Sequence, residues 1–148
     1  LKMLHAFNMT IPGIPIIYYG DEIGMPGAND PDNRRMMRFD NLTSFETDVK
    51  NTVTKLTNLR STHMALLYGD FEVLEVSETV YVYKRTYQDD VVIVAFNKSP
   101  EIKTIIVKDS GSKNPDKAQF GNGISTNDNT IAVFLAPYSF EVITMYNK

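Results

Sequence analysis

The loop at residues 21–41 carries the side chains best suited to binding chemistry. It contains several Asp and Glu carboxylates and three guanidinium groups, at Arg34, Arg35 and Arg38. A carboxylate accepts hydrogen bonds from hydroxyl groups and a guanidinium donates them, so such side chains can hold a polar ligand. Loops of this length in compact proteins are usually functional or disordered. We therefore look for a ligand site in this loop first.

Two adjacent carboxylates, Asp21 and Glu22, open the loop, and a pair of carboxylates can supply an acid and a base. Neighbouring residues on an extended chain point in opposite directions, so these two groups would not face one substrate together. We expect a supporting hydrogen-bonding role for them. No residue of the chain is identified as catalytic.

The sequence predicts no metal site and no cofactor. Cysteine is absent, and the two histidines, His5 and His63, lie on separate predicted helices without a third ligand. The Asp and Asn cluster at residues 29–33 does not have the spacing of a calcium-binding EF-hand loop and lacks its terminal Glu. The net charge of -3 and the lack of a basic run exclude an electrostatic footprint for nucleic acid.

The elements before the loop are typical of α/β structure. Apolar residues at helical spacing predict a helix over residues 1–8, which ends before Pro12 and Gly13. Residues 14–19, Ile-Pro-Ile-Ile-Tyr-Tyr, form an unbroken apolar run, which indicates a strand covered on both faces. Both tyrosines are then expected in the core. A single strand of this kind needs neighbours that the chain does not supply, so we expect them upstream of Leu1.

A helix and then a series of strands follow the loop. Thr43 and Glu46 have the spacing of a capping box, and an apolar stripe continues to about Tyr68, where Gly69 suits the end of the helix. After Gly69 the apolar period changes to two. Strands are predicted at residues 71–76, 80–87, 91–97, 102–107, 130–135 and 140–146. Residues 111–129 read as a loop with one short strand around Phe120. Short strands at this spacing predict an antiparallel sandwich or barrel.

Residues 13–22, Gly-Ile-Pro-Ile-Ile-Tyr-Tyr-Gly-Asp-Glu, closely resemble the eighth barrel strand of glycoside hydrolase family 13, the α-amylase family. Residues 27–35, Gly-Ala-Asn-Asp-Pro-Asp-Asn-Arg-Arg, resemble the loop that follows this strand in many members. The resemblance implies an α/β fragment, the last strand and helices of a (β/α)8 TIM barrel, at residues 1–69. It implies an all-β antiparallel Greek-key sandwich, the family's domain C, at residues 70–148.

The resemblance also implies a function. The family hydrolyses or transfers α-glucosidic bonds in starch and maltooligosaccharides by a retaining mechanism, which needs two carboxylates about 5–5.5 Å apart. In the family the catalytic carboxylates lie on earlier strands, so they are expected upstream of Leu1 and the chain alone is expected to be inactive. Asp30 and Arg34 match residues that contact sugar hydroxyls in related amylases. The alternative is a loop ion pair between Asp30 and Arg34, and both can hold together.

The expected partners are an α-glucan and the upstream barrel of the same polypeptide, without nucleic acid. Exposure of the strand at residues 14–19 predicts that a truncated chain pairs with another copy or packs this segment on its sandwich. Calcium, which family members often hold, is expected outside this part. The family implies an exported or cell-envelope protein.

The competing hypothesis is an autonomous carbohydrate-binding or structural module, with Tyr81 and Tyr83 as a sugar-stacking surface.

Overall fold

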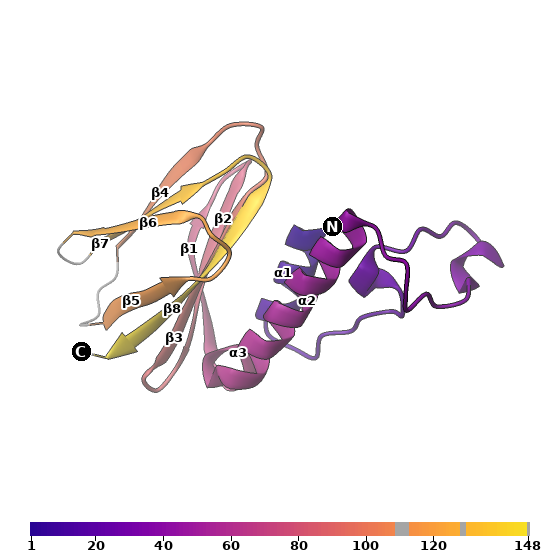
Figure 1. The fold of residues 1–148 in the computed structure, drawn as a ribbon. Helices are drawn as coiled ribbons and strands as arrows, with labels where there is room; N and C mark the ends of the chain where they lie inside the picture. Colours follow the sequence, from indigo (N-terminus) through magenta and orange to yellow (C-terminus); the bar gives the residue numbers. More distant parts are fainter. Residues whose placement is uncertain (109–112, 128–129, 148) are drawn as a thin grey trace.

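The computed structural model describes residues 1–108, 113–127 and 130–147. Its first part is helical and its second part is built of strands (Figure 1). The helical segments are α1 (Lys2–Thr10), η1 (Asp21–Ile23), η2 (Asp32–Arg34), α2 (Ser44–Thr62) and α3 (Met64–Tyr68). No helix among the described residues is long and apolar enough to cross a membrane.

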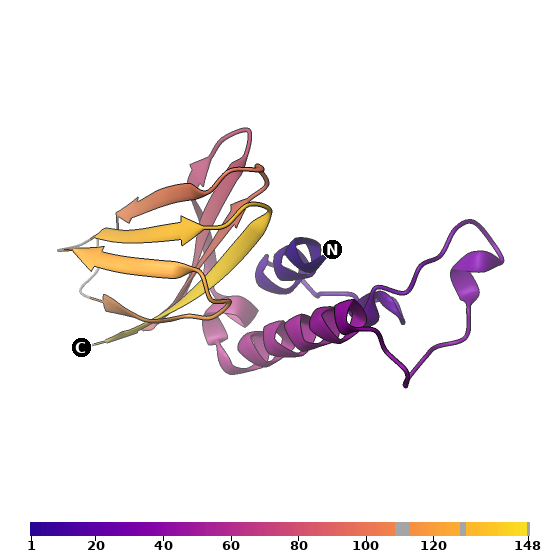
Figure 2. The ribbon, with the colours of Figure 1, turned by 45° about the horizontal axis from the view of Figure 1, so that its top comes forward.

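Two antiparallel sheets form the second part, as the alternating apolar pattern predicted. The strands are β1 (Asp70–Val76), β2 (Val80–Tyr87), β3 (Asp90–Asn97), β4 (Lys103–Lys108), β5 (Lys113–Ala118), β6 (Gly123–Asn127), β7 (Thr130–Leu135) and β8 (Ser139–Asn147). Five strands pair in the order β1-β2-β3-β8-β5, and three in the order β4-β7-β6. The sheets face each other as a β-sandwich, with the helices beside it (Figures 1 and 2).

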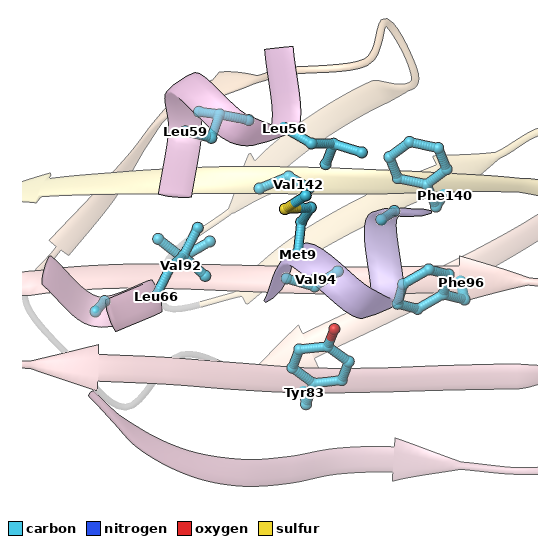
Figure 3. Close-up of a cluster of buried hydrophobic side chains, with 12 residues drawn as sticks. Met9, Leu56, Leu59, Leu66, Tyr83, Val92, Val94, Phe96, Phe140 and Val142 are labelled. Carbon is cyan, nitrogen blue, oxygen red and sulfur yellow. The ribbon is translucent and has the colours of Figure 1, made fainter. Parts of the chain in front are cut away.

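The central strands of the five-stranded sheet are buried on both faces, and β3 shows this most clearly. Val91, Ile93 and Ala95 face the core shared with the three-stranded sheet. Val92 and Val94, which alternate with them, face a second core under the helices. Figure 3 shows this second core, where Met9, Leu56, Leu59 and Leu66 of the helices meet Val92, Val94 and Val142 of the sheet. The helices and the sandwich are thus joined by a continuous apolar contact.

The capping box predicted at the start of α2 is present. The Glu46 backbone amide donates to Thr43 Oγ1 at 3.2 Å, and the Thr43 amide donates to Glu46 Oε2 at 2.7 Å. The hydrogen bond from the Thr43 amide lowers the pKa of the Glu46 carboxyl. The helix breaks at His63, which has extended backbone angles, so the predicted single helix is two.

Replacing Thr43 by Ala is expected to lower the free energy of unfolding by about 1 kcal/mol, because an amide of the first turn loses its acceptor. The measurement is urea denaturation followed by circular dichroism. Thr54→Ala, at an exposed position inside α2, is the control and should leave stability unchanged or raise it by a few tenths. An equal loss in both variants would contradict the capping role.

The prediction for residues 111–129 was wrong in part, within the residues that the structure describes. β5 and β6 lie in this segment, and Phe120 is in the turn between them rather than in a strand. The exposed residues of β6 are polar or Gly, so its sequence lacks the apolar alternation that would predict a strand. Residues 111, 112, 128 and 129 lie outside the described part of the chain.

The strand predicted at residues 14–19 does not form. These residues have no regular secondary structure, and they pair with none of the described strands. Ile17 packs at the edge of the core under the helices, whereas Ile14 and Ile16 are 91% and 79% exposed. Tyr18 and Tyr19 are also about half exposed, which corrects their expected place in the core. A strand needs partners for its backbone groups, and sequence pattern alone cannot supply them.

Candidate functional site

The loop after η1 extends away from the sandwich and from the helix pair (Figures 1 and 2). It runs from Gly24, which has a positive φ of 67°, to the Thr43 cap of α2. Met36 and Phe39 on this loop are 91% and 80% exposed. The loop is therefore a projecting segment that is anchored at both ends and carries exposed side chains.

Asp30 and Arg34 come together on this loop, across the short helix η2. Arg34 Nε donates to Asp30 Oδ1 at 2.6 Å, and both side chains are more than 60% exposed. The expected ion pair is therefore present. A surface ion pair of this kind adds little to the stability of the fold, so its stabilising effect does not by itself account for the pair. The pair presents an acceptor and a fork of donors to solvent, side by side.

A second ion pair stiffens the same turn. Arg35 Nε donates to Asp32 Oδ1 at 2.7 Å, and the Ala28 backbone amide donates to Asp32 Oδ2 at 2.8 Å. The hydrogen bond from Arg35 lowers the pKa of the Asp32 carboxyl, and the same bond raises the pKa of the Arg35 guanidinium. Asp32 is thus engaged on both oxygens within the loop, which leaves Asp30 and Arg34 as the more accessible pair.

Tyr18, Tyr19 and Glu22 lie where the loop leaves the helical part. The two tyrosine rings are 4.7 Å apart between centroids, and Tyr19 Oη donates to the Arg35 carbonyl at 3.1 Å. Glu22 Oε2 accepts from the Gly20 amide at 2.7 Å. Glu22 therefore has the supporting role expected from the sequence. Tyr19 connects the apolar segment to the turn that carries Asp30 and Arg34.

The stripe of Tyr81 and Tyr83 on β2 is an inner face. Tyr83 is fully buried, and its hydroxyl lies 2.5 Å from Thr10 Oγ1 of α1. Burial raises the pKa of the Tyr83 phenol. Tyr81 packs at the edge of the same core. Because α1 covers Tyr83, these two residues do not form the sugar-stacking surface considered from the sequence.

Two buried arginines, Arg60 and Arg85, hold the end of α1, and the sequence did not single them out. Arg60 donates to the carbonyls of Met9 at 2.7 Å and Gly13 at 2.5 Å. Arg85 of β2, which is 1% exposed, donates to the carbonyls of Thr10 and Gly69 at 2.8 and 2.9 Å. Burial lowers the pKa of both guanidiniums. Their positive charge complements the carbonyl end of a helix.

The two histidines make hydrogen bonds within the fold. His5 is buried, with Nε2 3.0 Å from the Asp21 carbonyl oxygen. His63 Nδ1 lies 2.8 Å from Asp90 Oδ1, and Asp90 Oδ2 accepts from the Ala65 amide at the start of α3. Within the described ranges, no three His, Asp or Glu side chains are grouped as metal ligands would be.

Comparison with known proteins finds a matching family and relatives that cover most of the chain. Residues 69–136 match the family described as Alpha-amylase C-terminal domain. A cyclomaltodextrinase of Geobacillus thermopakistaniensis is 34% identical over 143 residues, which is 95% of this chain and 24% of that protein. A cyclomaltodextrin glucanotransferase of Geobacillus stearothermophilus is 43% identical over 67% of this chain and 14% of that protein.

A solved structure extends the match to three dimensions. The α-amylase of Geobacillus thermoleovorans, solved in complex with acarbose, superimposes on 99% of this chain with a TM-score of 0.86 and 30% sequence identity. The matched part is 33% of that α-amylase chain. This chain therefore spans about a third of the solved relative and a quarter or less of the two curated relatives.

Proposed function

Because the chain belongs to the α-amylase family of glycoside hydrolases, we propose that it is the C-terminal portion of an enzyme that acts on α-glucans by a retaining mechanism. The substrate class would be starch or maltooligosaccharides. The observation that carries the proposal is a structural match to an α-amylase over 99% of the chain, which includes both the helical part and the sandwich.

The proposed division is residues 1–69 as the end of a (β/α)8 barrel and residues 70–148 as domain C. The exposed apolar segment at residues 14–19 supports this division. Ile14 and Ile16 are almost fully exposed although their neighbour Ile17 packs on the core, as a barrel strand without its partners would be. The parent enzyme would be exported or held in the cell envelope, because starch is an external substrate.

The catalytic carboxylates are proposed to lie in the upstream barrel, so this chain alone would not hydrolyse starch. A retaining mechanism needs a nucleophile and an acid/base carboxylate about 5–5.5 Å apart. Among the loop carboxylates, Asp32 is held on both oxygens by Arg35 and the Ala28 amide, and Glu22 accepts from the Gly20 amide. What the chain contributes is a contact with sugar hydroxyls at Asp30 and Arg34.

A chimera tests the proposal. This chain would replace the matching C-terminal third of the Geobacillus thermoleovorans α-amylase, and starch hydrolysis would be measured by release of reducing sugar. We expect hydrolysis by the chimera and none by the 148-residue chain alone. A chimera that folds, as judged by circular dichroism, but releases no sugar would refute the proposal, and so would hydrolysis by the chain alone.

Substitution of Asp30 or Arg34 in this chimera gives a sharper prediction. Arg34→Ala should raise KM for maltooligosaccharide about tenfold with little change in kcat, because charge-assisted hydrogen bonds to substrate hydroxyls are lost in ground state and transition state alike. Asp30→Ala should act in the same direction. Arg35→Ala, which breaks the neighbouring ion pair, is the matched control and should change KM less than twofold. An equal effect of Arg35→Ala would show that only the loop conformation matters.

A further inference from the structure

The turn between β5 and β6 carries the one Asn-Gly dipeptide of the sequence, at Asn122 and Gly123. Asparagine is among the thermolabile residues of proteins. The Gly123 nitrogen can attack Asn122 Cγ, which closes a five-membered succinimide and releases Nδ2 as ammonia together with the amide proton. Water then adds across one C–N bond of the ring and gives aspartate or isoaspartate. Glycine has no Cβ to hinder the attack, so Asn122 is the most reactive asparagine of the chain.

Hydrogen bonds at both ends hold the Asn122 side chain in the native structure. Its Nδ2 donates to the Phe140 carbonyl at 2.8 Å and to Glu141 Oε2 at 3.3 Å. Its Oδ1 accepts from the Ala136 backbone amide at 3.1 Å. The side chain therefore cannot turn toward the Gly123 nitrogen without giving up these three contacts.

The sheet holds the attacking residue as well. Gly123 is the first residue of β6, and its register partner on β7 is Phe134. Closing the succinimide ring requires rotation of the backbone between residues 122 and 123, which β-pairing resists. The turn must open before the reaction can occur, and a native chain opens only by local or global unfolding.

The buried Glu141 makes the product incompatible with this turn. Its side chain is fully buried, and its carboxylate accepts from the backbone amides of Phe120 at 2.6 Å and Asn122 at 2.8 Å. Aspartate at position 122 would replace the donor Nδ2 by an acceptor, next to Glu141 Oε2 and the Phe140 carbonyl. Acceptors that face each other without a donor, and two neighbouring carboxylates, are both unfavourable. Isoaspartate would add a carbon to the backbone and displace β6 from its register.

The turn also joins three parts of the molecule. It leads from β5 of the five-stranded sheet to β6 of the three-stranded sheet (Figure 1). The Gln119 amide donates to the Val142 carbonyl at 2.9 Å, and Lys55 Nζ of α2 lies 4.9 Å from the centroid of the Phe120 ring. A change in this turn therefore affects both sheets and their contact with the helices.

We propose that Asn122 is a deamidation site that the native fold shields and that reacts when the turn unfolds. The product cannot rebuild the contacts with Phe140 and Glu141, so each deamidated chain is lost from the native population. A chemical step of this kind in the unfolded state makes unfolding irreversible. The inference does not depend on the proposed function, because it concerns the folding of this chain and not hydrolysis.

The shielding is tested by peptide mass mapping of the chain after incubation at mildly alkaline pH, in native buffer and in guanidinium chloride. Deamidation at Asn122 should be at least about tenfold faster in denaturant, because the native chain reacts only through its open fraction. Asn51 and Asn58, which precede Thr52 and Leu59, are internal controls and should stay unmodified under both conditions. Equal rates at Asn122 in the two solutions would overturn the proposal.

The consequence is tested by refolding. The chain is held in denaturant for increasing times and diluted, and the yield of native circular dichroism should fall in step with the deamidated fraction. Gly123→Ala should slow the attack and preserve the yield, since its added Cβ meets only a Phe134 ring carbon at 3.4 Å. If the Gly123→Ala chain lost its yield as fast as the unchanged chain, deamidation would not be the cause.

Asn122→Asp reproduces one product directly. We expect its midpoint of urea unfolding to be lower by about 1 M, because the buried acceptors lose their donor. Asn51→Asp, at an exposed position within α2, is the matched control and should shift the midpoint far less. An Asn122→Asp chain as stable as the control would refute the incompatibility with Glu141. The refolding measurement does not use this variant, so it decides the question if Asn122→Asp does not fold.

Discussion

Replacing Arg85 by Met is expected to lower the free energy of unfolding by about 4 kcal/mol, the largest effect we predict for a side-chain truncation in this chain. Arg85 is 1% exposed, and its guanidinium donates to the carbonyls of Thr10, Gly69 and Asp70 at 2.8, 2.9 and 3.3 Å. Methionine fills most of the volume but provides no donor. The Thr10 carbonyl would remain buried without this donor, which costs about 1–3 kcal/mol, and the partly exposed carbonyls of Gly69 and Asp70 would lose hydrogen bonds to a charged group.

The loss should be measured by urea denaturation and located by amide hydrogen exchange. Because Arg85 belongs to β2 and Thr10 to α1, exchange should rise most in residues 5–11, where the helix meets the sandwich. Arg85→Lys keeps a charge but lacks the planar fork, so an intermediate loss is expected.

Lys84→Met is the matched control on the same strand. Its ammonium pairs with the exposed Glu72 carboxylate at 2.8 Å, so its loss should cost less than about 1 kcal/mol. If Arg85→Met cost no more than this control, the buried contacts of Arg85 with α1 would not contribute to stability. In that case the arginine would be a tolerated buried charge.

Gly69→Ala is expected to destabilise the chain by about 3 kcal/mol or more through a steric clash. A Cβ at Gly69 would overlap the Ala65 carbonyl oxygen and lie 2.8 Å from the Thr86 carbonyl oxygen. Its backbone angles, φ -70° and ψ 155°, suit any residue, so the requirement for Gly is one of space. Backbone atoms of α3 and β2 form the obstacle, and neither can move without disturbing helix or sheet. Thermal denaturation followed by circular dichroism measures the effect.

Gly123→Ala is the corresponding control on β6. The nearest atom to its added Cβ would be a Phe134 ring carbon at 3.4 Å, an ordinary contact. We expect a change within about 0.5 kcal/mol, as for most surface substitutions. A Gly69→Ala chain as stable as the Gly123→Ala chain would mean that α3 can shift away from β2 at little cost.

The elements that sequence reasoning predicted well are those with a strong local signal. β2 and β7 begin and end where the alternation of apolar residues predicted, and α2 begins at its capping box. β3 was predicted as a strand, but its burial on both faces was not. Its side chains contact helices on one side and the second sheet on the other, and only the packing of three layers shows which face meets which.

The failures share a different cause. β5 and β6 lack a clear apolar alternation, and their pairing with β8 and β7 comes from partners distant in the sequence. In the turn between them, the buried Glu141 carboxylate accepts from the amides of Phe120 and Asn122 at 2.6 and 2.8 Å. Residues 14–19 show the reverse case, a strong strand pattern without a partner strand among the described residues. A strand forms only when its backbone groups pair with a neighbouring strand, and the sequence pattern of one segment does not show whether that neighbour is present.

By itself, the sequence determined the family, the helical start, the antiparallel sandwich and the loop that carries Asp30 and Arg34, because these depend on local periods and on short motifs. The tertiary structure alone decided that Tyr83 is covered by α1 and that Arg60 and Arg85 hold the end of that helix. These contacts join residues up to 75 positions apart, from Thr10 to Arg85, and no local pattern records which distant side chains will meet.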